Sequence, residues 1–378
     1  MDFIVELDKV NEKSWNEALE NAGINGTIFQ SVFWAKYAEE VHGDYPIYLI
    51  STDKKGNING LLLAIQSRYG NYPAFNWGSC PGIRGFVIRK LYKTALRRIF
   101  DRTLPFIQWQ NGPVVIQHSS LENSSPDKTY GALLEKILNI AEARNFYAIR
   151  FARPPYFLDR SQLMSAYGFK KRRMGTILVD LGQSTESLWR SIDRSSRRNI
   201  EKTEADFTFA EVRNRADFQD FYNFHVQSTR RLGIEPYPVS HFESLWNFFS
   251  SLGKMAVFKA FFRNKPIAAS ICLLHNGMVH EYTYADSNYA RLNRIYAVEP
   301  LKWHIIRWAH ERSFRYFDLG GAFFFKIDAG DEKARNIYRF KKKWGKIVEF
   351  NDYSKTLRAR METKILSLFL TEGEGCHT

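Results

Sequence analysis

A run of three lysines between aromatic residues is the segment of this 378-residue chain best suited to chemistry. Residues 338–345 read Tyr-Arg-Phe-Lys-Lys-Lys-Trp-Gly, with Lys341 first in the run. A lysine ammonium directed into a cleft would stabilise the oxyanion of an acyl-transfer intermediate. Lysines between stacking rings also suit contact with nucleic acid. If the segment is a strand, Lys341 and Lys343 face one side and Lys342 the other.

Two groups of arginines are candidate phosphate ligands, because a guanidinium fork matches phosphate oxygens. One lies on a predicted helix over 190–202, where the charges are also typical of a solvated face. The other is Arg230 and Arg231, before a loop that ends near Tyr237. These two arginines either cap helix carbonyls or bind a diphosphate or a carboxylate. The basic residues of the predicted helix are Arg190, Arg194, Arg197, Arg198 and Lys202.

Two further motifs combine aromatic residues with a turn. Residues 29–36 read Phe-Gln-Ser-Val-Phe-Trp-Ala-Lys, a polar turn that leads into a helix carrying Lys36. Residues 316–321 read Tyr-Phe-Asp-Leu-Gly-Gly, a strand that ends in Asp318 and two glycines. Glycines in such a place indicate a tight turn or a close approach of the backbone to another group.

Several common enzyme classes lack support in the sequence. It contains no G-x-G-x-x-G fingerprint, no phosphate-binding P-loop, no H-E-x-x-H and no G-x-S-x-G elbow. His304 and His310 have no partner at metal-ligand spacing, and the three cysteines (Cys80, Cys272, Cys376) form no C-x-x-C pair. We therefore expect no metal, no cofactor and no disulfide framework.

Composition indicates a globular protein with polyanionic partners. The net charge is +14, and aromatic residues make up 15% of the chain. Such a charge favours nucleic acid, anionic lipid or phosphorylated metabolites without choosing among them. The sequence has no apolar run of about 20 residues, and its N-terminus has no signal-like apolar stretch, so we expect a cytoplasmic protein.

The helices and strands that must position these groups are predicted to occur twice along the chain, as an internal repeat. Each half has a predicted hairpin, over 47–65 and over 256–274, and the second is followed by a strand over 278–284. Each half then has an amphipathic helix that leads into a strand, at 133–151 and at 301–319. The two helix–strand segments match at an offset of 168 residues, which predicts two copies of one α/β unit.

Three helices are predicted between the copies, with start signals at Ser184 or Thr185, at Asp217 and at Ser240. The first should run on past Ile192 to Ile200. The third should open with a capping box, because Glu243 follows Ser240 by three residues. None of them sustains heptads, so no coiled-coil arm is expected. The polar stretch 117–128 is predicted to be an exposed loop.

In order along the chain, five motifs resemble the Fem family (FemABX) of aminoacyl-tRNA-dependent transferases, relatives of the GNAT acyltransferases. They lie at 29–36, 188–200, 229–234, 316–321 and 340–345. The resemblance implies an α/β (α+β) fold with two tandem GNAT-like domains, each a mixed twisted sheet flanked by helices. The first would cover 1–176, completed by 346–378, and the second 177–345.

The same resemblance implies an activity and roles for single residues. Members move an amino acid from its tRNA to an amine of a peptidoglycan precursor peptide. Lys341 matches the lysine that stabilises the tetrahedral intermediate. Lys36 and Arg231 match residues that bind the diphosphate of the precursor, and Tyr237 and Tyr284 match substrate-contacting tyrosines. Asp318 matches a structural position. Five basic residues are the candidates for tRNA contact: Arg194, Arg197, Arg198, Lys342 and Lys343.

One departure from the family keeps alternatives open. An aspartate proposed as a base often follows a Gly-Pro-Val segment, but residues 112–115 are followed here by Ile116, which accepts no proton. A GNAT-like N-acyltransferase with an acyl thioester donor for glycan or lipid modification is the first alternative. Against it, no R/Q-x-x-G-x-G/A loop for coenzyme A follows the hairpins. A non-catalytic RNA-binding protein is the second. The expected partners are an aminoacyl-tRNA donor and a phosphorylated peptide acceptor, and contact with an anionic membrane is consistent with the charge.

Overall fold

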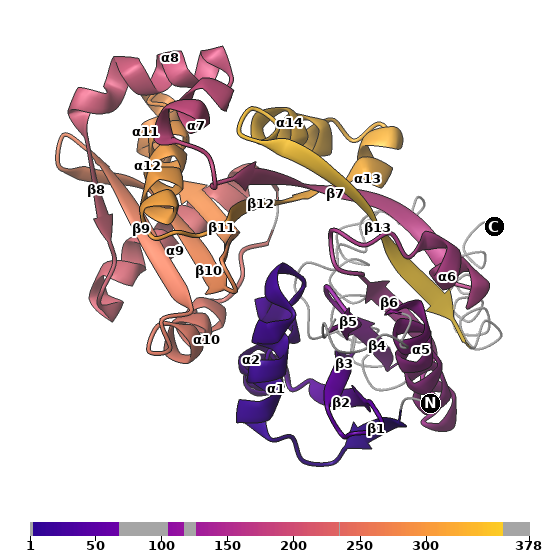
Figure 1. The fold of residues 1–378 in the computed structure, drawn as a ribbon. Coiled ribbons are helices and arrows are strands. Elements are labelled where there is room, and N and C mark those ends of the chain that lie inside the picture. The colour runs from indigo at the N-terminus through magenta and orange to yellow at the C-terminus, as the bar shows by residue number, and fades with distance from the viewer. Residues whose placement is uncertain (1–2, 68–104, 117–125, 234, 358–378) are drawn as a thin grey trace, which may run out of the picture. The chain divides into compact units, whose positions relative to one another are not determined.

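The computed structural model describes residues 3–67, 105–116, 126–233 and 235–357, which form two compact units (Figure 1). Of these residues, unit 1 holds 3–22, 29–67, 105–116, 126–172 and 351–357. Unit 2 holds 23–28, 173–233 and 235–350. Cys80 and Cys376 lie outside the described residues, and Cys272 is a buried free thiol.

Unit 1 is built on a mixed sheet in the order β1-β2-β3-β4-β6-β13. β4 and β6 are parallel, whereas β1, β2, β3 and β4 pair antiparallel in succession, β5 pairs with β3, and β13 is antiparallel to β6. The strands are β1 (Phe3–Leu7), β2 (Tyr45–Thr52), β3 (Ile58–Ser67), β4 (Phe106–Trp109), β5 (Val114–Val115), β6 (Ala148–Ala152) and β13 (Lys346–Thr356).

Helices cover both faces of this sheet. Side chains of β3 alternate between two cores, so that Leu62 packs on the side of α5 and Leu61 on the side of α1 and α2. Burial on both faces explains why β3 reads as a nearly continuous apolar run. The helices are α1 (Glu12–Asn21), α2 (Val32–His42), α5 (Pro126–Ala143) and α6 (Ser161–Ala166).

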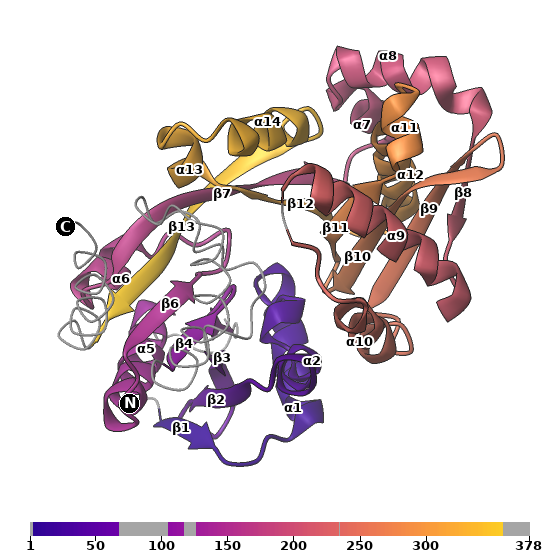
Figure 2. The same ribbon diagram turned by 180° about the vertical axis from the view of Figure 1, so that it is seen from behind.

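Unit 2 repeats this plan, with a mixed sheet in the order β7-β12-β11-β10-β9-β8 (Figure 2). Its one parallel pair in the described residues is β11 with β12. The strands are β7 (Lys170–Asp180), β8 (Phe207–Glu211), β9 (Met255–Phe262), β10 (Lys265–His275), β11 (Met278–Asp286) and β12 (Tyr316–Ala322).

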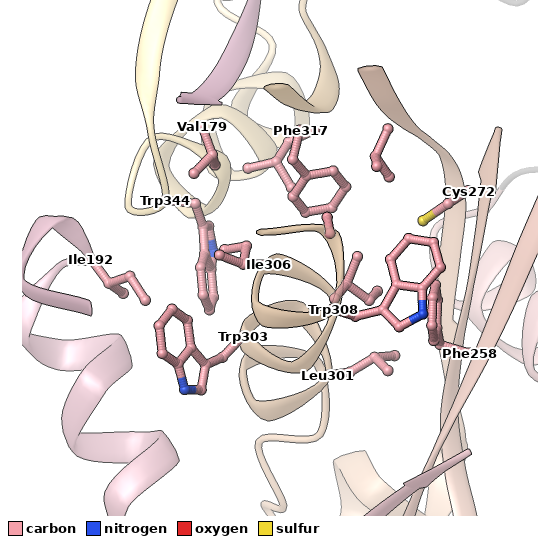
Figure 3. Close-up of a cluster of buried hydrophobic side chains, with 14 of the residues drawn as sticks. Val179, Ile192, Phe258, Cys272, Leu301, Trp303, Ile306, Trp308, Phe317 and Trp344 are labelled. Carbon is pink, nitrogen blue, oxygen red and sulfur yellow. The ribbon is translucent and has the colours of Figure 1, made fainter. Parts of the chain in front are cut away.

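The core of unit 2 lies between this sheet and α12. Trp303, Ile306 and Trp308 of α12 lie among side chains that include Phe258 and Phe317 of the strands (Figure 3). α9 packs against β10 and β11. The helices are α7 (Thr185–Ser191), α8 (Arg194–Thr203), α9 (Arg215–Arg231), α10 (Val239–Phe249), α11 (Asn288–Leu292), α12 (Val298–Glu311), α13 (Phe324–Asp328) and α14 (Glu332–Lys341).

The predicted repeat is confirmed. Both hairpins form, as β2–β3 and β9–β10, and both helix–strand segments form, as α5–β6 and α12–β12. In each copy the strand after the helix is parallel to a strand that precedes the helix, β6 to β4 and β12 to β11. The described helices include no coiled-coil arm and none that is long and apolar enough to cross a bilayer.

Four local predictions are wrong, and the strand considered for 338–345 does not form. α9 already begins at Arg215, two residues before the start predicted at Asp217. The helix predicted from Ser184 to Ile200 breaks at Ile192, because Asp193 caps a new helix, α8, by accepting a hydrogen bond from Ser195 N. α10 already begins at Val239 after Pro238, so Ser240 forms no capping box. Residues 126–128 of the predicted loop belong to α5, and 117–125 lie outside the described residues. The segment 338–345 is not a strand, because α14 runs to Lys341.

Candidate functional site in unit 2

The sheet of unit 2 opens where β11 and β12 stop pairing. Their parallel ladder ends at the pair His280–Asp318, although both strands continue. Against β10, β11 then gains an extra residue, Tyr282, and against β7, β12 gains one beside Gly320, which has φ +77°. Bulges re-aim side chains and often lie next to functional sites. Two bulges side by side therefore present irregular backbone and re-aimed side chains at one place.

A buried ion pair underlies this opening. Lys302 of α12 donates to both carboxylate oxygens of Glu281, at 2.7 and 2.6 Å, and each side chain is 1% exposed. Ser270 Oγ donates to the same carboxylate at 3.1 Å. The Tyr284 ring lies 4.2 Å from Lys302 Nζ. The extra residue in β11 explains how Glu281 and Tyr284, three positions apart, both reach Lys302.

A second buried carboxylate, Asp318, orients a histidine. Asp318 Oδ2 lies 2.8 Å from His280 Nδ1, and its Oδ1 accepts from Thr176 Oγ1 and, at 2.8 Å, from the Gly320 N–H. Although burial opposes ionisation, His280 and these hydrogen bonds lower the pKa of Asp318 to about 2. An ionised Asp318 only accepts hydrogen bonds, so His280 Nδ1 donates to it, which fixes the orientation of the ring.

Lys341, the last residue of α14, reaches this place through its side chain. Its Nζ donates to Gly321 O at 3.4 Å, the one hydrogen-bond partner it has among the described residues. A methyl group on Gly320 would lie 3.4 Å from the same nitrogen. Burial lowers the pKa of Lys341 to about 8, and the nearby Lys302 adds to this while Glu281 and Asp318 oppose it. The ammonium thus keeps donors for a further acceptor.

Tyr284 is the predicted substrate-contacting residue that lies with Lys341. Its ring is 6.3 Å from that of Phe340, the neighbour of Lys341, and burial raises the pKa of its hydroxyl. Tyr237 belongs to a different cluster, where its ring stacks on His241 at 4.4 Å and its N–H donates to His225 Nε2. Burial raises the pKa of Tyr237 as well.

Arg231 is engaged in hydrogen bonds within unit 2. Its guanidinium donates to Asn288 Oδ1 at 2.5 Å, to Ser228 Oγ at 3.0 Å and to the Asp286 carboxylate and carbonyl. It therefore joins the end of α9 to the end of β11. A phosphate would have to share this guanidinium with Asp286, and the predicted phosphate-binding role stays a prediction.

Lys36 lies in unit 1, on α2, and half of its side chain is exposed. Its Nζ is paired with Glu12 Oε2 at 2.7 Å. Ser31 caps α2 by accepting from Trp34 N, and the buried Gln30 side chain bridges Leu63 and Gln110 O. The polar residues Gln30 and Ser31 of the 29–36 motif thus make hydrogen bonds that stabilise the fold. The diphosphate contact of Lys36 stays a prediction.

The basic residues predicted to contact tRNA come from two segments that the fold joins. Asp193 N, at the start of α8, donates to Lys343 O at 2.9 Å. Arg194 and Arg198 of α8 are exposed, as is Lys342, whereas Arg197 and Lys343 are partly buried. An extended basic surface therefore includes both segments, as contact with a polyanion needs.

Metal and thiol chemistry find no support in the described residues. They contain no group of three or more His, Cys, Asp or Glu side chains that would hold a metal ion. Burial raises the pKa of the Cys272 thiol, so it is not a thiolate nucleophile at neutral pH. Ile116 is 4% exposed and packs in the core beside α1 and α2, which explains an apolar residue at that position.

Sequence reasoning missed His280, Glu281, Lys302 and Thr176 as residues of this site. The strand 278–284 was predicted, but a strand pattern does not show which neighbour each polar side chain meets. The available signal was two adjacent ionisable residues, His280 and Glu281, inside a predicted strand that follows an apolar hairpin. Lys302 was visible too, since it was the one charged residue in an apolar helical stripe.

Comparisons with known proteins agree with this fold. Residues 187–344 match a family model described as "Acetyltransferase (GNAT) domain". No curated protein sequence matches the chain. A tandem GNAT protein from the clavulanic acid biosynthesis pathway has a TM-score of 0.52 at 8% identity, and the match covers 94% of this chain and 98% of that one.

The chain also resembles FemX, with a TM-score of 0.68 at 15% identity over 96% of this chain and 99% of that one. L-PGS from Bacillus licheniformis gives 0.52 at 13% identity, over 95% and 96% of the two chains. At these identities the likeness concerns the fold. The predicted Fem-like, tandem GNAT fold is therefore confirmed.

Proposed function

We propose that this protein transfers an aminoacyl group from an aminoacyl-tRNA to an amine, and that the reaction takes place where β11 and β12 separate. The observation that carries the proposal is Lys341. Its side chain is partly buried, its ammonium has one long hydrogen bond to Gly321 O at 3.4 Å, and it lies beside backbone that bulges away from its neighbours. Preorganised donors of this kind stabilise charge that develops in a transition state.

The chemistry needs positioning and charge stabilisation rather than a covalent enzyme intermediate. An aminoacyl ester is already activated, so the acceptor amine attacks its carbonyl carbon and forms a tetrahedral oxyanion. Lys341 donates to that oxyanion. The attack forms the C–N bond, and collapse of the intermediate re-forms the carbonyl and breaks the ester C–O bond, which releases the tRNA hydroxyl. The amine proton passes to His280 Nε2 and from there to the leaving oxygen.

The role of His280 has a direct test. His280→Asn keeps a donor toward Asp318 but lacks the basic nitrogen, and we expect kcat to fall about 10²-fold, the lower range for a general base. Thr176→Val is the matched control, because it removes a hydrogen bond from the other oxygen of Asp318 and leaves the imidazole in place. Its kcat should change less than tenfold. Equal kcat for His280→Asn and wild type would remove His280 from the mechanism.

Two features favour tRNA over coenzyme A as the carrier of the acyl group. The segment 287–297, between β11 and α12, contains no glycine, so it lacks the loop expected to receive a coenzyme diphosphate. The basic surface of α8 and Lys342–Lys343 suits the phosphates of a tRNA. Arg194, Arg197 and Arg198 are the residues we assign to it on α8.

For the acceptor we propose a nucleotide- or lipid-linked precursor peptide of the peptidoglycan type, in the cytoplasm. Lys36, Arg231, Tyr237 and Tyr284 are the residues proposed to bind it. Tyr284 is supported by its place beside Lys302 and Phe340, within the site. Lys36 and Arg231 rest on the matched motifs, and Tyr237 rests on a looser match in spacing.

An N-acyltransferase that uses an acyl thioester is the second candidate. It is favoured by the match of residues 187–344 to an acetyltransferase domain model. The same Lys341 and His280 would serve it, since a thioester is also an activated acyl group attacked by an amine. Only the donor and its leaving group differ.

The experiment that tests the proposal follows radiolabelled amino acids from a total charged tRNA pool to a nucleotide-linked peptide acceptor. Label that reaches the acceptor amine, with release of free tRNA, supports it. Transfer from acyl-coenzyme A in its place would establish the second candidate. Binding of tRNA that is indifferent to charging, without transfer from either donor, would indicate a non-catalytic RNA-binding protein and overturn both.

A further inference from the structure

An apolar tip projects from unit 2 between β11 and α12. Leu292, at the end of α11, is 83% exposed, and Tyr296 and Tyr289 are 53% and 39% exposed. A single exposed apolar side chain is ordinary, but three within eight residues form a patch that marks an interaction surface.

The tip is held in shape by the protein itself. Ala290 is fully buried, and Ile295 packs against the core of unit 2. Ser287 Oγ accepts from Ala290 N at 3.1 Å, Ile295 N donates to Ala290 O at 2.8 Å, and Asn293 Nδ2 donates to Tyr289 O at 2.9 Å. Leu292 is thus presented to solvent by an ordered turn.

Basic residues surround this tip on three elements. Arg291 and Arg294 flank Leu292 and are exposed. Lys265, the first residue of β10, lies with its Nζ 3.5 Å from the centre of the Tyr289 ring. α8 lies at the same end of unit 2 as α11 (Figures 1 and 2), and its Asn199 contacts Glu299 in the first turn of α12 at 3.4 Å. The exposed basic residues of α8 include Arg194, Arg198 and Lys202.

Acidic residues at this end that are exposed, Glu201 of α8 and Glu204 after it, are fewer than the basic ones, and two other carboxylates near the tip are paired. Asp286, at its base, is 6% exposed and bonded to Arg231 and Arg291. Asp206 is paired with Arg263 at 3.0 Å. The end of unit 2 that carries Leu292 therefore combines exposed apolar side chains with an excess of positive charge.

We infer that the tip (Tyr289, Leu292 and Tyr296 with Arg291 and Arg294) inserts at the surface of an anionic lipid bilayer. Leucine gains from burial at the boundary of the acyl chains, tyrosines favour the headgroup level, and basic residues attract anionic lipids. RNA would use the arginines and tyrosines but would leave Leu292 exposed. The inference concerns a surface of unit 2 and does not depend on the proposed acyl donor.

The test is co-sedimentation of the full chain with phosphatidylcholine vesicles that contain 30% phosphatidylglycerol. We expect binding that weakens with salt, is weak to pure phosphatidylcholine, and falls at least tenfold in Leu292→Ser. Leu252→Ser is the matched control: Leu252 is 44% exposed in the turn after α10, at the opposite end of unit 2, and its loss should change nothing (Figures 1 and 2).

Three outcomes would overturn the inference. Leu292→Ser could bind the anionic vesicles like wild type, or wild type could fail to bind them. The substitution could also leave vesicle binding intact but abolish tRNA binding, which would make the tip an RNA-binding surface. If it instead converted an oligomer to a monomer, the tip would be an interface with a second copy of the chain. Transfer to a water-soluble amine should be unchanged in Leu292→Ser, so a failure of this inference is distinguishable from a failure of the proposed function.

Discussion

The two units share one plan but differ at the end of their parallel strand pair. In unit 1 the ladder of β4 and β6 ends at Trp109 and Ala152, both buried. In unit 2 the ladder of β11 and β12 ends at His280 and Asp318, with the Glu281–Lys302 pair and Lys341 beside it. The last pair of the parallel ladder is thus formed by buried Trp109 and Ala152 in unit 1 and by ionisable residues in unit 2.

Unit 1 also buries charge, but in a closed form. Asp352 is 2% exposed and accepts from both Arg153 and Arg172, while the Gln30 amide is fully used by backbone groups. Lys341 in unit 2 has one long hydrogen bond among the described residues. The comparison indicates that these buried polar groups of unit 1 are bonded within the protein, whereas the Lys341 ammonium of unit 2 has donors left for a ligand.

The largest effect expected from this difference is on stability, at the buried pair of unit 2. Lys302→Met leaves the Glu281 carboxylate buried without a counter-charge, which should lower the free energy of unfolding by about 3–5 kcal/mol. The double variant Glu281→Gln/Lys302→Met should lose less. Urea denaturation followed by tryptophan fluorescence measures both.

The exposed pair of unit 1 supplies the control. Lys36→Met breaks a half-exposed ion pair with Glu12, worth about 0–1 kcal/mol. Equal losses for Lys302→Met and Lys36→Met would mean that the pair in unit 2 is solvated, contrary to its 1% exposure.

The pH dependence of transfer should come from unit 2. Lys341 has a pKa of about 8, lowered chiefly by burial, and stabilises an oxyanion only while it is protonated. kcat/KM should therefore decline above pH about 8, toward tenfold per pH unit, and Lys341→Arg should move the decline to higher pH because arginine stays charged. A rate that rises through pH 8 and loses that rise in Lys341→Arg would make Lys341 a base.

The smallest effect is expected from Lys36. Lys36→Ala should raise KM for a diphosphate-bearing acceptor several-fold and leave kcat unchanged, because it removes binding that ground state and transition state share. An acceptor without the diphosphate should show no change in KM. A fall in kcat without a change in KM would mean that Lys36 acts in the chemical step, and would contradict the claim that the catalytic groups belong to unit 2.

Much of the fold was predictable, because hairpins and amphipathic helices have a local periodicity that can be recognised in the sequence. The break at Ile192 was not predicted, although Asp193 is a strong N-cap residue by type, because the apolar positions continue with helical spacing on both sides of it. The hydrogen bond from its N–H to Lys343 O, 150 positions away in the sequence, could not be read from local pattern. The strand considered for Lys341 failed for a similar reason, since alternating aromatic and basic residues also suit the last turn of a helix.

The candidate site was predictable in part. Lys341 was identified from a motif and Tyr284 from a looser match to the family, and in the structure Lys302 lies near the rings of both Tyr284 and Phe340, the neighbour of Lys341. His280 was not identified, because its significance depends on a hydrogen bond to Asp318, 38 residues away, and on the bulges that end the ladder there. The domain limits at 176 and 345, and the roles of Arg231 and Tyr237, stay predictions.

The most direct test of the central claim is the single-turnover rate of aminoacyl transfer by Lys341→Met, with both substrates saturating and with unchanged circular dichroism as evidence of folding. The account predicts a rate about 10²–10³ times lower than wild type, the loss typical of an oxyanion donor, while Lys36→Ala under the same conditions keeps the wild-type rate. A wild-type rate for Lys341→Met would contradict the account and move the chemistry away from the strand divergence of unit 2.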